Sequence, residues 1–172
     1  MFDRLVDLFV QFLHLFRFWS VIDCYQRGVV LRLGRHHRDL EPGLHWIWPF
    51  GIEHVFAANV VTNTTNLGVQ SLTTRDGHSI SVSSLLTWRV LEPAKFLLEV
   101  EGGQEAISDL CYGAVADVVK AATWAEVSEP KFADQCATRL RRRASRYGLE
   151  IERLQFSDLT KCRSLRLWAG VH

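Results

Sequence analysis

The stretch that most constrains the fold is residues 42–51, which read Pro-Gly-Leu-His-Trp-Ile-Trp-Pro-Phe-Gly. The Pro–Gly at its start predicts a turn, because Pro presets φ and Gly tolerates positive φ. The next five residues favour a strand, and Pro49 has no N–H for a sheet ladder, so the strand ends or lies at an edge there. Alternation then places Trp46 and Trp48 on one face and Ile47 on the other, and one of these faces has to be core.

This stretch permits two interpretations. One is a buried strand with a turn at each end. The other is an aromatic surface at a lipid interface, where Trp side chains are enriched. Under the second interpretation Trp46, Trp48 and Phe50 contact the membrane. If the tryptophans are core instead, the lipid contact falls to Ile47, Pro49 and Phe50.

Residues 2–19 are a second aromatic segment, and on a helix most of their polar side chains gather in an arc of roughly 140°. A helix of about 18 residues rises about 27 Å, close to the hydrocarbon thickness, but Asp7, Gln11, His14 and Arg17 oppose a spanning helix. Three alternatives remain: a helix in the membrane interface, a helix packed on the chain's own core, and a bundle of copies sharing the polar stripe. So much apolar area would not stay in water, which favours the interface. The expected membrane contacts are Phe2, Leu5, Leu8, Phe9, Phe12, Leu13, Phe16 and Trp19.

Composition and motifs exclude several classes of function. The net charge is +1, so no global field attracts nucleic acid. The four cysteines form no CxxC pair, and His36–His37 lacks a third metal ligand at a recognised spacing. No GxSxG, HExxH, P-loop or GxGxxG motif is present. We therefore expect no enzyme activity, no cofactor, no metal site and no nucleic-acid partner.

Cys24 follows the predicted N-terminal helix closely. This position is typical of an acylation site next to a membrane anchor. An ordinary thiol in a strand or linker is the simpler explanation of the same residue.

Strand patterns dominate the chain up to residue 90. Residues 29–33 alternate after a turn predicted at Arg27–Gly28, and residues 35–41 are predicted to be a charged loop. Asp76–Gly77 is a strong hairpin signal. The strand after it places one set of apolar side chains on a single face, which predicts an antiparallel strand with its other face in water. That set is Ile80, Val82, Leu86, Trp88 and Val90.

Helical periodicity follows. After a short helix, residues 105–122 carry an i, i+3, i+4, i+7 apolar stripe that predicts a helix packed on a sheet. Ser128 can cap the next helix and Gly148 ends it. A last strand is predicted over residues 149–154, and residues 159–172 can form a short amphipathic tail.

Arginines crowd the second half of the helix that ends at Gly148. A solvated face that favours the dipole at the helix C-terminus is one explanation. Anionic lipid headgroups and an acidic surface on a neighbouring copy are the others. The candidates for such a lipid or partner contact are Arg139, Arg142, Arg143 and Arg146.

Short motifs in one order and spacing carry a family resemblance. They are Gln-Arg-Gly-Val-Val at 26–30, Leu-Gly-Arg at 33–35, Pro-Gly-Leu-His at 42–45, Thr-Arg-Asp-Gly at 74–77, Trp-Arg-Val at 88–90 before Glu-Pro-Ala-Lys-Phe at 92–96, and Tyr-Gly-Leu-Glu-Ile at 147–151. Together they resemble the SPFH or band-7 domain. That family includes stomatins, prohibitins, flotillins and bacterial regulators of membrane-bound AAA proteases.

The resemblance implies an α+β fold, with a twisted, mainly antiparallel sheet packed by helices and anchored to a membrane from the N-terminus. It also implies large oligomers that organise lipids and partner proteins. We expect residues 1–20 to form the membrane-associated helix, residues 21–158 the SPFH/band-7-like domain, and residues 159–172 a tail without a long coiled coil.

The expected function is that of a non-enzymatic, membrane-associated scaffold that oligomerises and organises a membrane microdomain or partner membrane proteins. The alternative is a regulatory binding module of a membrane protease or channel without large self-assembly. Arginines stand at both ends of the N-terminal segment, so the sequence predicts no side of the membrane.

Overall fold

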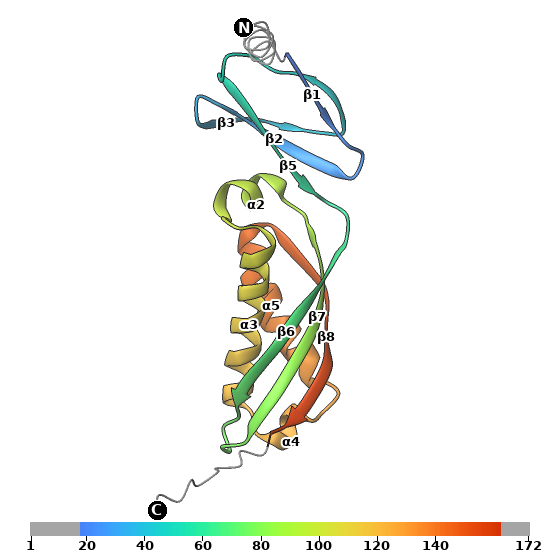
Figure 1. The fold of residues 1–172 in the computed structure, drawn as a ribbon, viewed down its shortest axis with the longest axis vertical. Coiled ribbons are helices and arrows are strands. Elements are labelled where there is room, and N and C mark those ends of the chain that lie inside the picture. Colours follow the sequence, from blue (N-terminus) through green and yellow to red (C-terminus); the bar gives the residue numbers. More distant parts are fainter. Residues whose placement is uncertain (1–17, 163–172) are drawn as a thin grey trace, which may run out of the picture.

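The computed structural model describes residues 18–162, which form two units arranged along the long axis of the molecule (Figure 1). A small all-β unit carries the N-terminal end, and a larger unit of one sheet and several helices carries the C-terminal end. The two ends of the described chain therefore lie at opposite ends of the molecule. Helix α2 (Pro93–Glu99) lies at the junction and contacts two strands of the small unit.

Two antiparallel sheets make up the small unit. One pairs β1 with β4, and the other has the strand order β3-β2-β5. The strands are β1 (Trp19–Ile22), β2 (Gln26–Arg32), β3 (Arg35–Leu40), β4 (Gly43–Trp46) and β5 (Glu53–Asn59). Their shared core is small: Ile22, Val30 and Leu40 are buried together, with Val55 partly buried against them, and Val29, Ile47 and Ala58 are buried outside this cluster. A unit that buries so little apolar surface depends on backbone pairing and polar contacts for its order.

The larger unit has one antiparallel sheet in the order β6-β7-β8, and helices α3 and α5 cover one face of it (Figure 1). The main hydrophobic core fills the space between this sheet and these helices. The elements are β6 (Asn63–Thr73), β7 (Ser79–Val90), α3 (Gln104–Ala121), α4 (Trp124–Val127), α5 (Phe132–Ala144), the 3₁₀ helix η1 (Ser145–Tyr147) and β8 (Leu149–Lys161).

The strongest local patterns of the sequence are confirmed in this unit. Asp76–Gly77 forms the β6–β7 turn, and Gly77 has a φ of 80°. Gly148 ends η1 in the left-handed conformation, with a φ of 70°. The predicted apolar faces of β7 and α3 are buried, including Ile80, Leu86, Ile107, Cys111 and Val115. The mixed α+β fold is therefore as expected, although residues 18–162 form three separate sheets rather than one.

The turn predicted at Arg27–Gly28 is wrong, because both residues lie inside β2. The chain turns earlier, between β1 and β2. Gly28 is needed for a different reason: a Cβ on it would lie 2.8 Å from the carbonyl oxygen of Phe56 on β5. The glycine therefore permits the close approach of β2 and β5.

The loop predicted over residues 35–41 is also wrong, because residues 35–40 form β3. A tight hairpin joins β2 to β3 through Leu33 and Gly34, both with positive φ (50° and 78°). Five of the six β3 side chains are exposed and only Leu40 is buried. An edge strand with so few buried side chains leaves no alternating apolar pattern in the sequence.

Three boundaries differ from expectation. Ser128 follows α4 and does not cap α5, whose N-cap is Lys131. Thr123 caps α4 through a capping box with Glu126, which the sequence interpretation missed. The last strand continues to Lys161, three residues into the predicted tail.

Most of the predicted N-terminal helix, residues 2–19, lies outside the described residues. Trp19, its last predicted member, begins strand β1 instead. Among the helices of residues 18–162, none combines the length and the apolar character needed to cross a bilayer.

Candidate membrane-contact surface

The β1–β4 ribbon presents one apolar face. Trp19 pairs with Trp46, and Val21 pairs with Leu44. Cross-strand partners share a face of the ribbon, and so do residues two apart on one strand. All four residues are more than half exposed, from 57% for Trp19 to 71% for Leu44. The Phe18 ring stacks on Trp46, with 5.3 Å between ring centroids. The ribbon therefore offers a continuous apolar strip to its surroundings.

The turn after β4 carries two more exposed aromatic side chains, Trp48 and Phe50. The Ile47 N–H donates to the Phe18 carbonyl oxygen at 2.7 Å, and the Ile47 side chain is buried. Trp48 and Phe50 are 54% and 59% exposed. Phe50 has a φ of 63°, a conformation that is uncommon outside glycine and costs on the order of 1 kcal/mol. The sequence left open which face of residues 46–48 is core. In the structure Ile47 is core, and Trp46 and Trp48 form the outer face.

A buried carboxylate holds this turn in place. Oε2 of Glu53 accepts the Trp48 N–H at 3.0 Å, while Oε1 accepts two N–H groups of Arg32, at 3.0 Å from Nε and 2.7 Å from Nη2. Nη2 of Arg38 lies 3.9 Å from Oε2 and also donates to the Trp46 carbonyl oxygen. The Glu53 side chain has no solvent exposure, whereas Arg32 is 40% exposed. The carboxylate thereby ties β2, β3 and β5 to the aromatic turn.

Opposing effects act on the pKa of Glu53. Burial alone would raise the pKa, because it disfavours the charged form. The hydrogen bonds from Trp48 and Arg32, with the charges of Arg32 and Arg38, outweigh burial and hold the pKa below its ordinary value. Glu53 is therefore a carboxylate at neutral pH.

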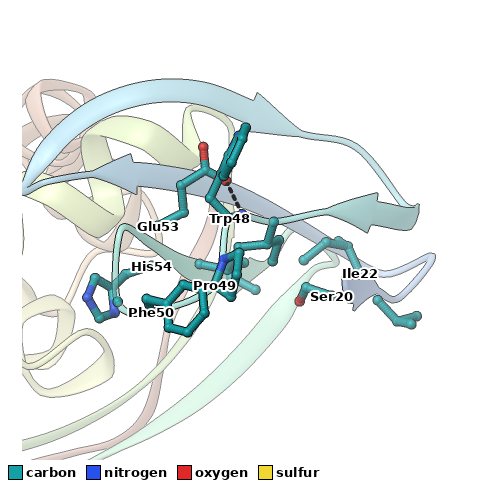
Figure 2. A pocket seen from close by; sticks show the side chains of 12 residues that line it. Ser20, Ile22, Trp48, Pro49, Phe50, Glu53 and His54 are labelled. Carbon is teal, nitrogen blue, oxygen red and sulfur yellow. Dashed lines mark hydrogen bonds between the residues drawn. The ribbon is translucent and has the colours of Figure 1, made fainter. Parts of the chain in front are cut away.

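Behind the turn lies an open hollow of about 590 Å³. Figure 2 shows Ser20 and Ile22 of β1 on one side of it and Phe50 and His54 on the other. Its lining is mostly apolar, and the Glu53 carboxylate already accepts hydrogen bonds from Trp48 and Arg32. The hollow leaves open space behind the turn, and its lining presents no cluster of reactive groups.

Four of the residues that the sequence predicts to contact the membrane lie together in the structure, beside two apolar residues that were not predicted. Trp19, Trp46, Trp48 and Phe50 lie at one end of the molecule, on the β1–β4 ribbon and the turn that follows it. Val21 and Leu44 belong to the same strip and were missed, because they become neighbours only when β1 pairs with β4. The remaining expected contacts lie outside the described residues: Phe2, Leu5, Leu8, Phe9, Phe12, Leu13 and Phe16.

The described cysteines fall into two classes. Cys24 is exposed in the turn between β1 and β2, so its thiol is accessible, and acylation there stays a prediction. Cys111 and Cys136 are buried in the main core, and burial raises the pKa of each to about 12. These two residues therefore remain protonated at neutral pH and act as small core side chains.

The arginines of α5 and η1 fall into two groups, according to whether their side chains have partners in the described part of the chain. Arg141 donates to the carbonyl oxygens of Ile151 and Glu152, at 2.9 Å each, and so covers the open edge of β8. Arg143 forms an ion pair with Asp117 of α3 at 2.5 Å. The other three arginines of α5 and η1 make no hydrogen bond or ion pair through their side chains within residues 18–162: Arg139, Arg142 and Arg146.

Comparison with known proteins places this geometry in a family. The model of the SPFH domain / Band 7 family matches residues 20–166. The chain belongs to the SPFH/band-7 family. The match begins at residue 20, next to Trp19 at the start of β1. It therefore includes most of the apolar strip as well as the larger unit.

Several proteins are similar to this chain over part of their length. An uncharacterized protein of Archaeoglobus fulgidus is 31% identical over 120 residues, which is 70% of this chain and 48% of that protein. Protein HflK of Vibrio cholerae is 32% identical over 94 residues, 55% of this chain and 24% of HflK. The stomatin homolog of Pyrococcus horikoshii is 27% identical over 100 residues, 58% of this chain and 37% of that protein. The chain thus spans less than half the length of each of these three relatives.

Proposed function

We propose that this protein is a non-enzymatic, membrane-associated scaffold that oligomerises and organises a membrane microdomain or partner membrane proteins. The observation that carries the proposal is the exposed apolar strip at one end of the molecule. Isolated exposed apolar side chains are ordinary, but a contiguous strip that includes Trp19, Val21, Leu44 and Trp46 marks a binding surface. Trp is a residue of the membrane interface, where an apolar ring meets polar headgroups.

Two features support lipid as the binding partner of this strip. The predicted amphipathic segment, residues 2–19, runs directly into β1, so its expected lipid contacts would reach the same membrane as the strip. Membership in the family that includes the stomatin homolog and HflK agrees with this placement. Under the proposal, the aromatic end rests on the membrane and the larger unit extends away from it (Figure 1).

The first test replaces Leu44 by glutamine. We expect Leu44→Gln to weaken binding to liposomes by roughly tenfold, and Leu44→Gln with Trp46→Gln by more, because each apolar side chain contributes about 1.5–3 kcal/mol when it leaves water. Liposome flotation of the full chain measures this. The matched control is Val69→Gln, an aliphatic side chain on β6 that is as exposed as Leu44, at 71%. Equal loss of flotation in both single variants would contradict the assignment of the strip.

The second test separates the scaffold from its alternative. A scaffold predicts one heavy, discrete species of the full chain in mild detergent, measured by mass photometry. A regulatory binding module of a membrane protease or channel, without large self-assembly, predicts monomers or dimers. A monomeric wild-type protein would overturn the scaffold and leave membrane association to the flotation result.

A further inference from the structure

The three arginines of α5 and η1 that have no side-chain partner in the described part of the chain lie on one outward stripe. At 100° per residue, Arg139, Arg142 and Arg146 fall within about 60° of one another around the axis of α5 and its continuation η1. All three side chains are exposed. The dipole at the helix C-terminus favours cations in the last turn, which accounts for Arg142 and Arg146. It does not account for Arg139, which stands more than a turn before the end of α5.

Next to this stripe lies a groove of opposite charge. It has a volume of about 400 Å³ and runs between the end of α2, the first turns of α3, and the end of α5. Its apolar floor includes Val100, Ala106, Leu110 and Tyr147. Its rim carries three carboxylates, Glu99, Glu101 and Asp109, which make no ion pair within the described part of the chain.

Within residues 18–162, no ion pair joins the stripe to the groove, although the charge of Glu99 acts on nearby Lys95. Arg143 borders the groove, but its guanidinium is engaged by Asp117. Lys95, the cation of α2, is engaged by Glu92 at 2.6 Å. Like charges held together repel one another, and opposite charges on a partner relieve that cost as they approach.

We propose that the arginine stripe of one copy docks into the acidic groove of a second copy of this chain. The inference rests on the oligomerisation proposed above and names its interface. Charge complementarity favours a second copy as the occupant, because the groove offers an apolar floor with a negative rim and the stripe is a row of long, positive side chains. Arg side chains bury their stems on apolar surface while the guanidinium meets carboxylates.

The positions of the two surfaces agree with an association between neighbouring copies. The stripe lies on α5 and η1, and the groove lies between α2, α3 and the end of α5. These helices belong to the part of the molecule below the small β unit in Figure 1, so a membrane bound to the apolar strip leaves both surfaces free to meet a neighbour. Because the stripe and the groove are adjacent and opposite in charge, they can pair about a two-fold axis or from head to tail. A head-to-tail arrangement forms a ring when the rotation between successive copies closes, and an open filament when it does not.

Charge reversal tests this interface. One variant of the full chain carries Arg139→Glu, Arg142→Glu and Arg146→Glu, and a second carries Glu99→Arg, Glu101→Arg and Asp109→Arg. We expect each to weaken self-association at least about tenfold, because like charges then face each other. The chain with all six substitutions, and a 1:1 mixture of the two variants, are expected to recover the assembly. Lys120→Glu, in the last turn of α3, is the control for loss of one exposed cation.

Mass photometry in mild detergent, at low and high salt, reads out the assembly, and circular dichroism checks that each variant is folded. A monomeric wild type overturns this inference together with the scaffold. An oligomeric wild type with equally oligomeric reversal variants overturns the interface alone. So does a loss that neither the six-substitution chain nor the mixture recovers. If the stripe variant keeps its oligomers but loses flotation with anionic vesicles, the stripe binds lipid and the inference is wrong.

Discussion

Replacing Glu53 by glutamine is expected to destabilise the small β unit by about 2–3 kcal/mol. Removing one partner of a buried ion pair costs about 3–5 kcal/mol, and the partial exposure of Arg32 reduces that figure, because water reaches the guanidinium left behind. A glutamine amide cannot accept from both Trp48 and Arg32 as the carboxylate does. The small unit has few buried apolar side chains to offset the loss.

Hydrogen exchange followed by mass spectrometry resolves this effect by region. We expect amides of β2 and β5 to exchange roughly 30- to 150-fold faster in Glu53→Gln, which is the same free energy expressed as a ratio. Amides of β7 should be unchanged, because the main core is separate. Glu41→Gln, an exposed carboxylate beside Pro42, is the matched control. Equal protection of β2 and β5 in the wild type and Glu53→Gln would show that the carboxylate does not hold the unit together.

The pH dependence of the same comparison has a definite sign. Folding lowers the pKa of Glu53, so its contribution to stability is complete above the ordinary value of 4.5 and is lost as the pH falls through the lower folded value. The difference between the wild type and Glu53→Gln should therefore be largest at neutral pH and shrink below about pH 4.5. Glu53 accepts a hydrogen bond from the Trp48 N–H and so positions the turn that carries Trp48. We therefore expect liposome binding of the variant to weaken as well.

The predictable part of the fold is the part with local periodicity. The faces of β7 and α3 each repeat along one element, so the sequence alone identifies their buried side chains. The small unit lacks such a signal. β3 has one buried side chain, and Gly28 marks the close approach of a strand that begins 25 residues later, at Glu53. Pairing between distant residues decides these strands, and no local pattern records it.

The same distinction applies to the candidate site. Alternation placed Trp46 and Trp48 on one face, but the identity of the core face depends on the contact of Ile47 with Phe18, far away in the sequence. Glu53 had no sequence signal at all, because its partner Arg32 lies on another strand. In the sequence, Glu53 followed by His54 cannot be told from two polar residues on an exposed strand.

Substituting Gly148 is expected to have the second large effect, by pushing apart the two segments that meet beside the acidic groove. Gly148 has a φ of 70°, and a Cβ on it would lie 2.7 Å from both the Cβ and the carbonyl oxygen of Glu92. Its own carbonyl oxygen accepts the N–H groups of Leu91 and Glu92, at 2.9 and 3.0 Å. These contacts fix the end of β7 against the start of β8, so the new methyl group has no direction in which to relax.

We expect Gly148→Ala to lower the free energy of unfolding by about 2–5 kcal/mol, which combines about 1–2 kcal/mol for the left-handed conformation with about 1–3 kcal/mol for overpacking. Gly77→Ala is the matched control, because Gly77 has a φ of 80° and a Cβ on it would meet no atom within 4 Å. It should lose only the first contribution. Thermal unfolding followed by circular dichroism measures both, and a loss of about 1 kcal/mol shifts the Tm of a chain of this size by about 2–4 °C. Equal shifts for the two variants would mean that Glu92 moves away freely, and that the β7–α2 corner is not held by Gly148.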